Sequence, residues 1–265
     1  MRYIYDNDLH IHSGISACSA DKTQTPERIL TYAQENNLKT VALTDHFWDE
    51  TVPGASAWYA PQNYARICQA KPLPKADGIR YLFGCEIDMD KHLTLGLTKE
   101  HFDRFDFVVI PTTHLHMSGF TISQEDGESV QTRADLWIKR LDALLNMDLP
   151  FEKIGIAHLA CPLIDNRSRQ AYLSVLEHIP EAEMKRLFMK AAKLGAGIEL
   201  NQTDMCFSEE EADIVLRPFR IAKACGCKFY FGSDAHHPHE LESAKAIFER
   251  AIDLLGLEES DKFQV

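Results

Sequence analysis

The sequence predicts an α/β fold made of about seven units, each a parallel strand followed by a helix. Short apolar runs alternate along the chain with segments of helical periodicity. Most of the runs are nearly continuous in apolar residues, as expected for parallel strands that are covered on both faces. Right-handed crossovers would wind these units into a barrel or an open doubly wound sheet. In either arrangement the C-terminal ends of the strands face one side of the molecule, where sites are built.

Each strand is predicted from one apolar run. The runs are Leu9–His12, Thr40–Thr44, Tyr81–Ile87, Phe107–Pro111, Ile154–Ala157, Gly197–Leu200 and Phe229–Gly232. Each run ends in a polar residue or is followed by one within a few positions. These polar residues are the first candidates for a functional site.

Helices are predicted between the runs from caps and apolar periodicity. Thr25 is an expected N-cap, followed by Pro26 at the first helical position. Ser208 and Glu211 form an expected capping box at another helix start. Further amphipathic helices are predicted over Ala134–Asn146, from about Pro180, and over Leu241–Leu255. Their apolar stripes are assigned to the core.

No linker, repeat or low-complexity segment divides the chain, so residues 1–265 are predicted to form a single domain. Residues Trp48–Pro74 form a long connection rich in Pro, Gly and aromatic residues. It is interpreted as an irregular insertion or a lid over a site, and we favour the insertion.

Charge and composition exclude several classes of protein. The net charge of −12 argues against binding of long nucleic acid or of an anionic membrane surface. The sequence contains no run of 18 apolar residues, so no membrane span is predicted. The first residues do not resemble a signal peptide. The seven cysteines include no CxxC pair, which favours a reducing, cytoplasmic location.

Histidines and carboxylates lie at the ends of six of the seven predicted strands. His10 and His12 are two apart, so they point the same way and can bind one metal together. The remaining strand-end residues are Asp45, His46, Glu86, His114, His158, Asp234 and His236. Carboxylates buried side by side repel one another, and divalent cations resolve that conflict. Imidazole and carboxylate together suit Zn, Fe or Mn.

The number of candidate ligands predicts more than one metal. A single catalytic zinc uses three protein ligands, whereas this set offers eight or more. Two or three divalent ions are therefore expected, with Glu86 the best candidate to bridge a pair.

The motifs Asp8-Leu9-His10-Ile11-His12-Ser13, Thr44-Asp45-His46 and Ser233-Asp234-Ala235-His236, with Glu86, His114 and His158, resemble the PHP (polymerase and histidinol phosphatase) superfamily. The resemblance spans nearly the whole chain. It implies a distorted seven-stranded (β/α)7 barrel and a two- or three-metal site that hydrolyses phosphoesters. It further implies that His10, His12, Glu86 and Asp234 hold one metal, that Glu86, His114 and His158 hold a second, and that His46 and His236 contribute to a third.

The third metal is where this sequence departs from the family. Many members place a His or Asp five or six residues after the second His, but here those positions are Ala17 and Cys18. Cys18 as a thiolate, or Asp21 three residues further on, is the expected replacement. Absence of the third metal is the remaining alternative.

The expected activity is hydrolysis of a small phosphomonoester, histidinol-phosphatase-like or acting on a nucleotide or sugar phosphate, by a metal-activated hydroxide. Glu86, Asp234 and His236 are the expected catalytic residues, and His116 or His236 is a candidate leaving-group acid. Substrate-binding roles are predicted for Arg167, Arg169 and Asn201, because a guanidinium matches phosphate geometry; Arg133 is a weaker candidate.

Two other functions are weighed. Amidohydrolase-type enzymes also open with HxH and commonly use a carbamylated Lys on the fourth strand, but Phe107–Pro111 contains no Lys. A non-catalytic PHP-like structural or regulatory module would be expected to have lost ligands, whereas this chain keeps nearly all of them. The oligomeric state is left open.

Overall fold

Eight parallel strands form one sheet in the computed structural model, which describes residues 1–19, 21–127 and 129–265. The strands are β1 (Asn7–Ile11), β2 (Thr40–Leu43), β3 (His46–Phe47), β4 (Arg80–Ile87), β5 (Phe107–Pro111), β6 (Ile154–Ala157), β7 (Gly197–Asn201) and β8 (Lys228–Gly232). Their order is β1-β2-β4-β5-β6-β7-β8, and β3 pairs with the C-terminal end of β4. All seven predicted strands are confirmed. The sequence did not predict β3, whose His46 pairs with Glu86 rather than continuing β2.

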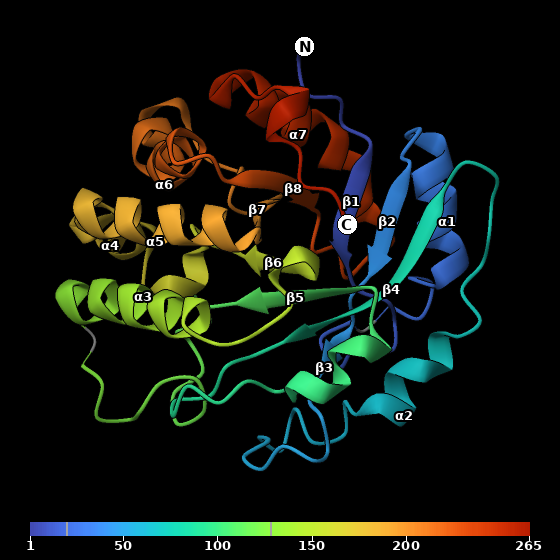
Figure 1. The fold of residues 1–265 in the computed structure, drawn as a ribbon, viewed down its shortest axis with the longest axis horizontal. Helices are drawn as coiled ribbons and strands as arrows, with labels where there is room; N and C mark the ends of the chain where they lie inside the picture. Colours follow the sequence, from blue (N-terminus) through green and yellow to red (C-terminus); the bar gives the residue numbers. More distant parts are fainter. Residues whose placement is uncertain (20, 128) are drawn as a thin grey trace.

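The sheet nearly closes into a barrel where β8 meets β1 (Figure 1). Just beyond β8, Asp234 N donates to His10 O at 2.7 Å, and His12 N donates to Ala235 O at 3.1 Å. Nearer the start of β1, the side chains of Asn7 and Asp8 accept from Phe231 N and Ser233 N, at 3.1 and 3.0 Å. Side chains thus replace part of the backbone ladder at this seam. The predicted distorted barrel is confirmed.

Seven α-helices occur in the described residues. They are α1 (Pro26–Glu35), α2 (Tyr64–Ile67), α3 (Val130–Leu145), α4 (Arg169–His178), α5 (Glu181–Leu194), α6 (Ala212–Ala224) and α7 (Leu241–Leu255). Helices α3 to α6 pack against one another as a layer on one flank, at the left of Figure 1. None of the described helices is long and apolar enough to cross a membrane.

The predicted caps form as expected. The Thr25 side chain accepts from Arg28 N at the start of α1, and Pro26 is its first residue. Both hydrogen bonds of the capping box between Ser208 and Glu211 are present, on a short 3-10 turn that leads into α6.

Two connections differ from a regular strand–helix repeat. In the described residues, β2 is followed by β3 and the four-residue α2, and β4 by a 3-10 helix (Lys99–Arg104) instead of an α-helix. After β6, by contrast, α4 precedes α5, although the sequence analysis predicted no helix from Arg169. Its N-cap, Ser168, accepts from Ala171 N.

The inside of the barrel is apolar at one end and polar at the other. A small cluster that includes Leu9, Phe107, Val109 and Tyr230 fills the N-terminal end, and Phe263 from the C-terminal segment packs into it. The main core lies between the strands and the helices. The polar residues at the C-terminal strand ends therefore lie at the end of the barrel opposite the small apolar cluster.

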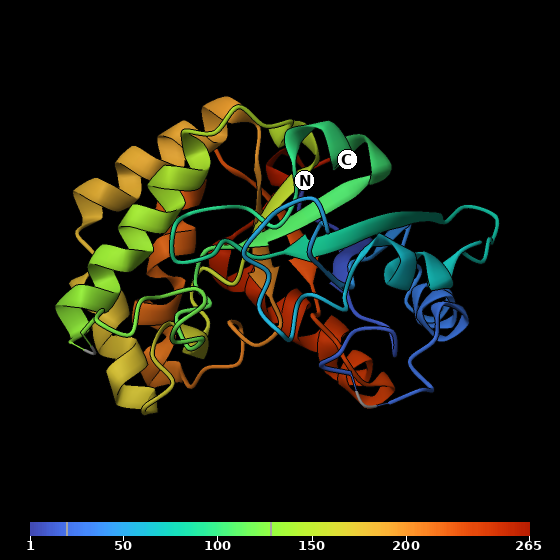
Figure 2. The same ribbon diagram turned by 90° about the horizontal axis from the view of Figure 1, so that it is seen from below.

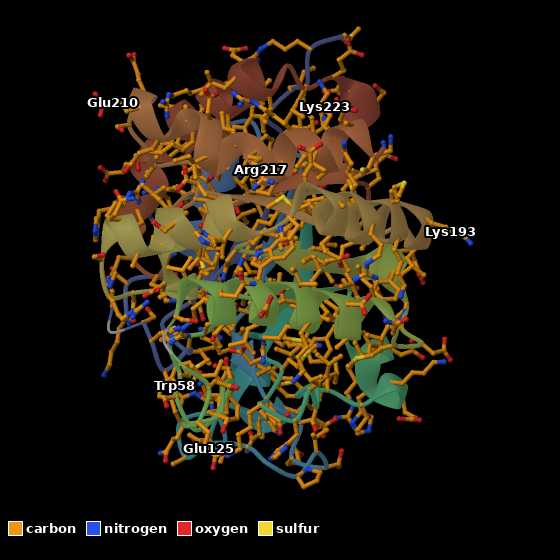
Figure 3. All side chains as sticks on the ribbon, turned by 90° about the vertical axis from the view of Figure 1, so that its left-hand side faces the viewer. Trp58, Glu125, Lys193, Glu210, Arg217 and Lys223 are labelled. Atoms are coloured by element: carbon orange, nitrogen blue, oxygen red, sulfur yellow. The ribbon has the colours of Figure 1, made fainter. Side chains whose placement is uncertain are left out.

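The Trp48–Pro74 connection packs over the polar end of the barrel. Trp48, Val52 and Tyr59 form a separate buried cluster, and Met117 and Phe120 from the segment after β5 pack against it. Figure 2 shows these irregular segments near the middle of the molecule, beside the strands. Trp58 lies in the lower, loop-rich part of Figure 3, apart from the helices that carry Lys193 and Arg217. The favoured interpretation as a plain insertion is incomplete, because this segment covers the site.

Candidate metal centre

The strand ends bring their histidines and carboxylates into overlapping groups. His10, His12, Glu86 and Asp234 form one group, in which the potential ligand atoms all lie within 4.8 Å of one another. Glu86, His114 and His158 form a second. The fold therefore places together the two sets that the resemblance assigned to a first and a second metal.

Two further groups overlap with these. One consists of His12, Cys18, His46 and His236, and the other of His10, His158 and Glu199. The first contains the predicted third-site histidines together with a cysteine, and the second contains a residue that the sequence analysis did not single out.

Glu86 lies at the centre of the site and lacks hydrogen bonds. Its side chain is fully buried, and neither carboxylate oxygen has a hydrogen-bond partner in the structure. Oε2 is 2.9 Å from His46 Nδ1 and 3.2 Å from His12 Nε2. Oε1 is 4.0 Å from His114 Nε2 and 3.8 Å from His158 Nε2. A buried carboxylate without hydrogen bonds is costly, and divalent cations between it and these imidazoles would compensate that cost. The donor set fits metal ions.

Electrostatics hold the central carboxylates ionised. Burial alone would raise the pKa of Glu86, but the surrounding histidines, His46 and His10 foremost, hold it well below its ordinary value. Asp234 behaves in the same way, with its pKa lowered chiefly by His10 and His12 against the effect of burial. Burial and the neighbouring His46 oppose protonation of His12, yet the close carboxylates of Asp234 and Glu86 raise its pKa to about 9. The pocket thus holds two buried, ionised carboxylates whose charge is offset by neighbouring imidazoles or by bound cations.

Two of the strand-end residues adopt left-handed backbone conformations. His158 has φ 53° and Asp234 has φ 54°, a region that residues other than glycine rarely occupy. His158 directly follows Ala157, the last residue of β6, and Asp234 lies two residues after Gly232, the last residue of β8. Such local strain is typical of functional sites, where the surrounding structure holds it in place. Here the conformation turns both side chains towards Glu86 and the histidines of β1.

Glu199 orients His10 from behind. It is fully buried in β7; its Oε1 is 2.6 Å from His10 Nδ1, and its Oε2 accepts from His158 N at 2.9 Å. A carboxylate that accepts from Nδ1 fixes the imidazole tautomer and leaves Nε2 for a metal. Because its oxygens are used in this way, we interpret Glu199 as a supporting residue rather than a ligand.

Similar contacts hold the other imidazoles. His114 Nδ1 is 2.9 Å from Asp88 Oδ2, which also accepts from the Tyr59 hydroxyl at 2.5 Å. His236 Nδ1 donates to Asp234 O at 2.7 Å. His12 Nδ1 is 3.2 Å from Ser16 Oγ, which in turn donates to Asp45 Oδ1 at 2.7 Å. These contacts direct the Nε2 atoms of His114, His236 and His12 towards the centre.

A cavity of about 460 Å³ opens over these groups. Besides the strand-end residues it is lined by Cys18, Trp58, Tyr59, His116, Met117 and Leu163. Asn201 lines an adjoining hollow that shares His158, Leu163, Asp234 and His236 with the cavity. His116 therefore faces the cavity, and its pKa is lowered to about 4 by burial first and by His114 second. No lysine or arginine of the described residues lines either space.

The two replacement candidates for the third site differ in position. Cys18 lies in the group with His12, His46 and His236 and lines the cavity. Asp21 belongs to none of the groups formed by the described residues. Its carboxylate accepts from Thr23 N and Thr23 Oγ1 and lies 3.7 Å from His237 Nδ1. The geometry favours Cys18, because Asp21 is used by its own turn.

The arginines predicted to bind phosphate lie in ion pairs and outside the cavity lining. Arg167 contacts the buried Asp165 through Nε at 2.9 Å and Nη2 at 2.6 Å. Arg169, at the start of α4, makes a bidentate pair with Glu211 at 2.9 and 2.7 Å. Arg133 is buried in α3, and its Nη1 donates to Leu115 O. The sequence analysis placed Arg167 and Arg169 in a loop; in the structure Arg167 precedes α4, Arg169 is its first residue, and both side chains pair with carboxylates. Their predicted role in phosphate binding stays a prediction.

A comparison with models of known protein families shows to which family this chain belongs. The PHP domain model matches residues 8–203, which is most of the chain. The chain belongs to the PHP domain family. The PHP match, the fold and the buried ligand groups together are those of a PHP-family metal-dependent phosphoesterase. The amidohydrolase alternative is set aside. A search of curated protein sequences finds no match.

Solved structures agree with this PHP fold. Histidinol phosphate phosphatase from Lactococcus lactis, complexed with Zn, L-histidinol and phosphate, is 18% identical, with a TM-score of 0.60; the match covers 99% of this chain and 100% of that one. A proposed histidinol phosphatase from Listeria monocytogenes is 15% identical, with a TM-score of 0.60 and coverage of 91% and 99%. At these identities the likeness establishes the fold alone.

Sequence reasoning missed the residues that support the ligands. Glu199 interrupts an otherwise apolar strand, and a charge inside a buried strand is a usable signal. Asp88 lies two residues after Glu86, and this spacing gave a weaker signal. Tyr59 carried no local signal, because only the folded connection brings its hydroxyl to Asp88.

Proposed function

We propose that this PHP-family protein hydrolyses a small phosphomonoester at a centre of at least two divalent metal ions. His10, His12, Glu86 and Asp234 would hold one ion, and Glu86, His114 and His158 a second. The observation that carries the proposal is the fully buried Glu86 carboxylate, which has no hydrogen-bond partner and belongs to both ligand groups.

The metal ions would supply Lewis-acid activation of water and neutralise the phosphate oxygens. The chain's own residues set the geometry for this. Glu199 and Asp88 hold the tautomers of His10 and His114. His116 and His236 face the cavity and are the candidates to protonate the leaving oxygen.

The walls of the cavity point to a small substrate with a single phosphate. A second phosphate would need a cation, and the lining residues of the described chain include no lysine or arginine. Trp58, Met117 and Leu163 offer apolar surface to the leaving group. Asn201 in the adjoining hollow provides a polar side chain for the rest of the substrate. Histidinol phosphate is the first compound to test, given the structural likeness to a histidinol phosphate phosphatase.

The test is elemental analysis of the protein purified without added metal, followed by a phosphate-release screen. Histidinol phosphate, nucleoside monophosphates and sugar phosphates form the panel. We expect bound Zn, Mn or Fe and release from at least one monoester. Bound metal without turnover of any phosphoester would instead indicate the non-catalytic module.

Glu86→Gln is the decisive variant. The amide keeps the size of the side chain but loses the charge and the bidentate ligation, so metal content and turnover should both be lost. Glu210→Gln, at an exposed position, is the matched control and should leave both unchanged. Full activity in Glu86→Gln would contradict the proposed mechanism.

A further inference from the structure

We propose that Trp58 determines which leaving groups the cavity accepts, by stacking on a planar aromatic ring of the substrate. The inference rests on the proposed function, since it concerns the alcohol part of the phosphomonoester. Trp58 lines the cavity, yet 39% of its side chain is exposed. Of the six large hydrophobic side chains that are exposed in the described part of the chain, Trp58 is the one that lines this cavity. Aromatic side chains commonly form the walls of small-molecule sites.

The indole is held in place by its ring and by its backbone. The ring makes T-shaped contacts with Tyr59 and His46, at centroid distances of 4.7 and 5.0 Å and interplanar angles of 86° and 71°. The fully buried Gln62 donates from Nε2 to Trp58 O at 3.3 Å and accepts at Oε1 from Ala17 N at 2.9 Å. Trp58 is therefore fixed before a ligand arrives, which lowers the entropy cost of binding.

The indole lies close enough to the candidate metal centre for one small substrate to reach both. The His46 ring that it contacts belongs to a candidate ligand, whose Nδ1 is 2.9 Å from Glu86 Oε2. The cavity of about 460 Å³ falls within the usual size range of small-molecule sites. A phosphate at the metal centre and a ring on Trp58 can thus belong to one molecule with a short linker.

The rest of the cavity wall suits a flat ring without negative charge. Met117 and Leu163 line the cavity together with Trp58, and a methionine sulfur makes favourable contacts with aromatic rings. No lysine or arginine of the described residues lines the cavity, so a second anionic group on the leaving group would lack a cationic partner. The substrate class is therefore a phosphomonoester of an alcohol or phenol that carries an aromatic ring, in preference to an open-chain or sugar phosphate.

Non-hydrolysable phosphonates test this inference without turnover. The affinity of the full-length, metal-loaded protein for benzylphosphonate and for methylphosphonate is measured by titration calorimetry. We expect Trp58→Ala to weaken binding of benzylphosphonate about tenfold and to change that of methylphosphonate by less than about twofold, because only the first ligand has a ring. Metal content should stay at the wild-type value. Trp58→Leu keeps apolar bulk without a ring and should resemble Trp58→Ala, whereas Trp58→Phe should keep most of the affinity.

Tryptophan fluorescence gives an independent readout. The chain has three tryptophans, and Trp48 and Trp137 are buried. A ring stacked on Trp58 should change the emission when benzylphosphonate is added, and this change should be absent in Trp58→Phe. Met189→Ala is the matched control, because this side chain in α5 is 57% exposed and lies outside the cavity lining. It should bind both phosphonates like the wild type.

Equal weakening of both phosphonates in Trp58→Ala, or no weakening of either, would overturn the inference. Wild-type affinity for benzylphosphonate in Trp58→Leu would also overturn it, because an aliphatic side chain cannot stack. Binding that depends on Trp58 in a protein that hydrolyses no phosphomonoester would remove the proposed function and leave the stacking role standing. Hydrolysis that is indifferent to Trp58 would do the reverse.

Discussion

At the residue scale, buried side chains behind the strand-end histidines hold the candidate ligands in place. Glu199 is fully buried and binds both His10 Nδ1 and the backbone of His158. Glu199 therefore orients the ring of His10 and holds the main chain of His158, two candidate metal ligands. Supporting contacts of this kind raise ligand basicity and orient the ring, so their loss weakens metal binding without removing a ligand.

Glu199→Gln tests this role. The amide preserves the shape of the side chain, but it replaces the negatively charged acceptor of the His10 Nδ1 hydrogen bond with a neutral one. We therefore expect the affinity for metal to fall about 10- to 100-fold. Competition with a chelator of known affinity measures the change. Glu209→Gln, at an exposed position, should be unaffected. Wild-type affinity in Glu199→Gln would assign the residue to packing alone.

Arg169 is expected to act in stability rather than in substrate binding. The pKa of the Glu211 carboxyl is lowered to about 2, chiefly by the hydrogen bonds from Arg169. A depressed carboxyl pKa stabilises the fold above the ordinary value of 4.5, and the contribution is lost as the pH falls towards 2. In Arg169→Ala we expect the pKa of Glu211 to return towards 4.5, followed by carboxyl NMR titration, while turnover stays within about twofold. A large rise in KM in Arg169→Ala would instead show that Arg169 binds the substrate.

At the element scale, the strand ends determine the site. The sheet register places His46 opposite Glu86, and the backbone bonds between β1 and β8 place Asp234 beside His10. Gly232, the last residue of β8, makes this close approach possible. A Cβ there would meet the Glu199 carboxylate and lie 2.7 Å from His10 Cβ.

Gly232→Ala should therefore damage both stability and metal binding. The added methyl displaces Glu199 or His10, and such overpacking costs about 1–3 kcal/mol. Thermal unfolding and metal content measure the two effects. Gly127→Ala is the matched control, since the nearest atom to its Cβ would be Thr132 Oγ1 at 3.6 Å. Equal thermal stability and metal content in the two variants would show that the structure around Gly232 can shift to accommodate a methyl group.

At the scale of the whole molecule, the barrel is polar at one end and closed by apolar side chains at the other. Phe263 packs with Phe107 and Tyr230, at ring centroid distances of 6.1 Å to each, and Phe263 N donates to Phe229 O at 2.8 Å. The C-terminal segment thus completes the interior that the strands leave open. It lies at the end of the barrel opposite the metal ligands.

Phe263→Ala should lower stability without changing metal binding. Truncation of a buried phenylalanine costs about 3–5 kcal/mol. Denaturant unfolding measures the loss, and metal content should stay at the wild-type value. Leu254→Ala, where the side chain is 42% exposed, should have little effect on either. A loss of metal in Phe263→Ala at low temperature would show that the two ends of the barrel are coupled.

Much of the fold and of the ligand set follows from local signals. Apolar runs locate the strands, because burial on both faces removes polar residues from them. His10, Glu86 and Asp234 were predicted because parallel strands place their C-terminal ends together. The substrate-binding role of Arg167 and Arg169 stays a prediction, and local patterns did not indicate that these side chains pair with Asp165 and Glu211.

The sequence by itself determined the fold class, the PHP family and the residues that meet at the strand ends, because these depend on periodicity and on residue type at fixed places. Only the tertiary structure decided what surrounds them. Glu199, Asp88 and Tyr59 join the site, Cys18 lies among its histidines, and Asp21 does not. The physical reason is that these contacts join segments far apart in the chain, whose approach is determined by packing and barrel closure rather than by any local pattern.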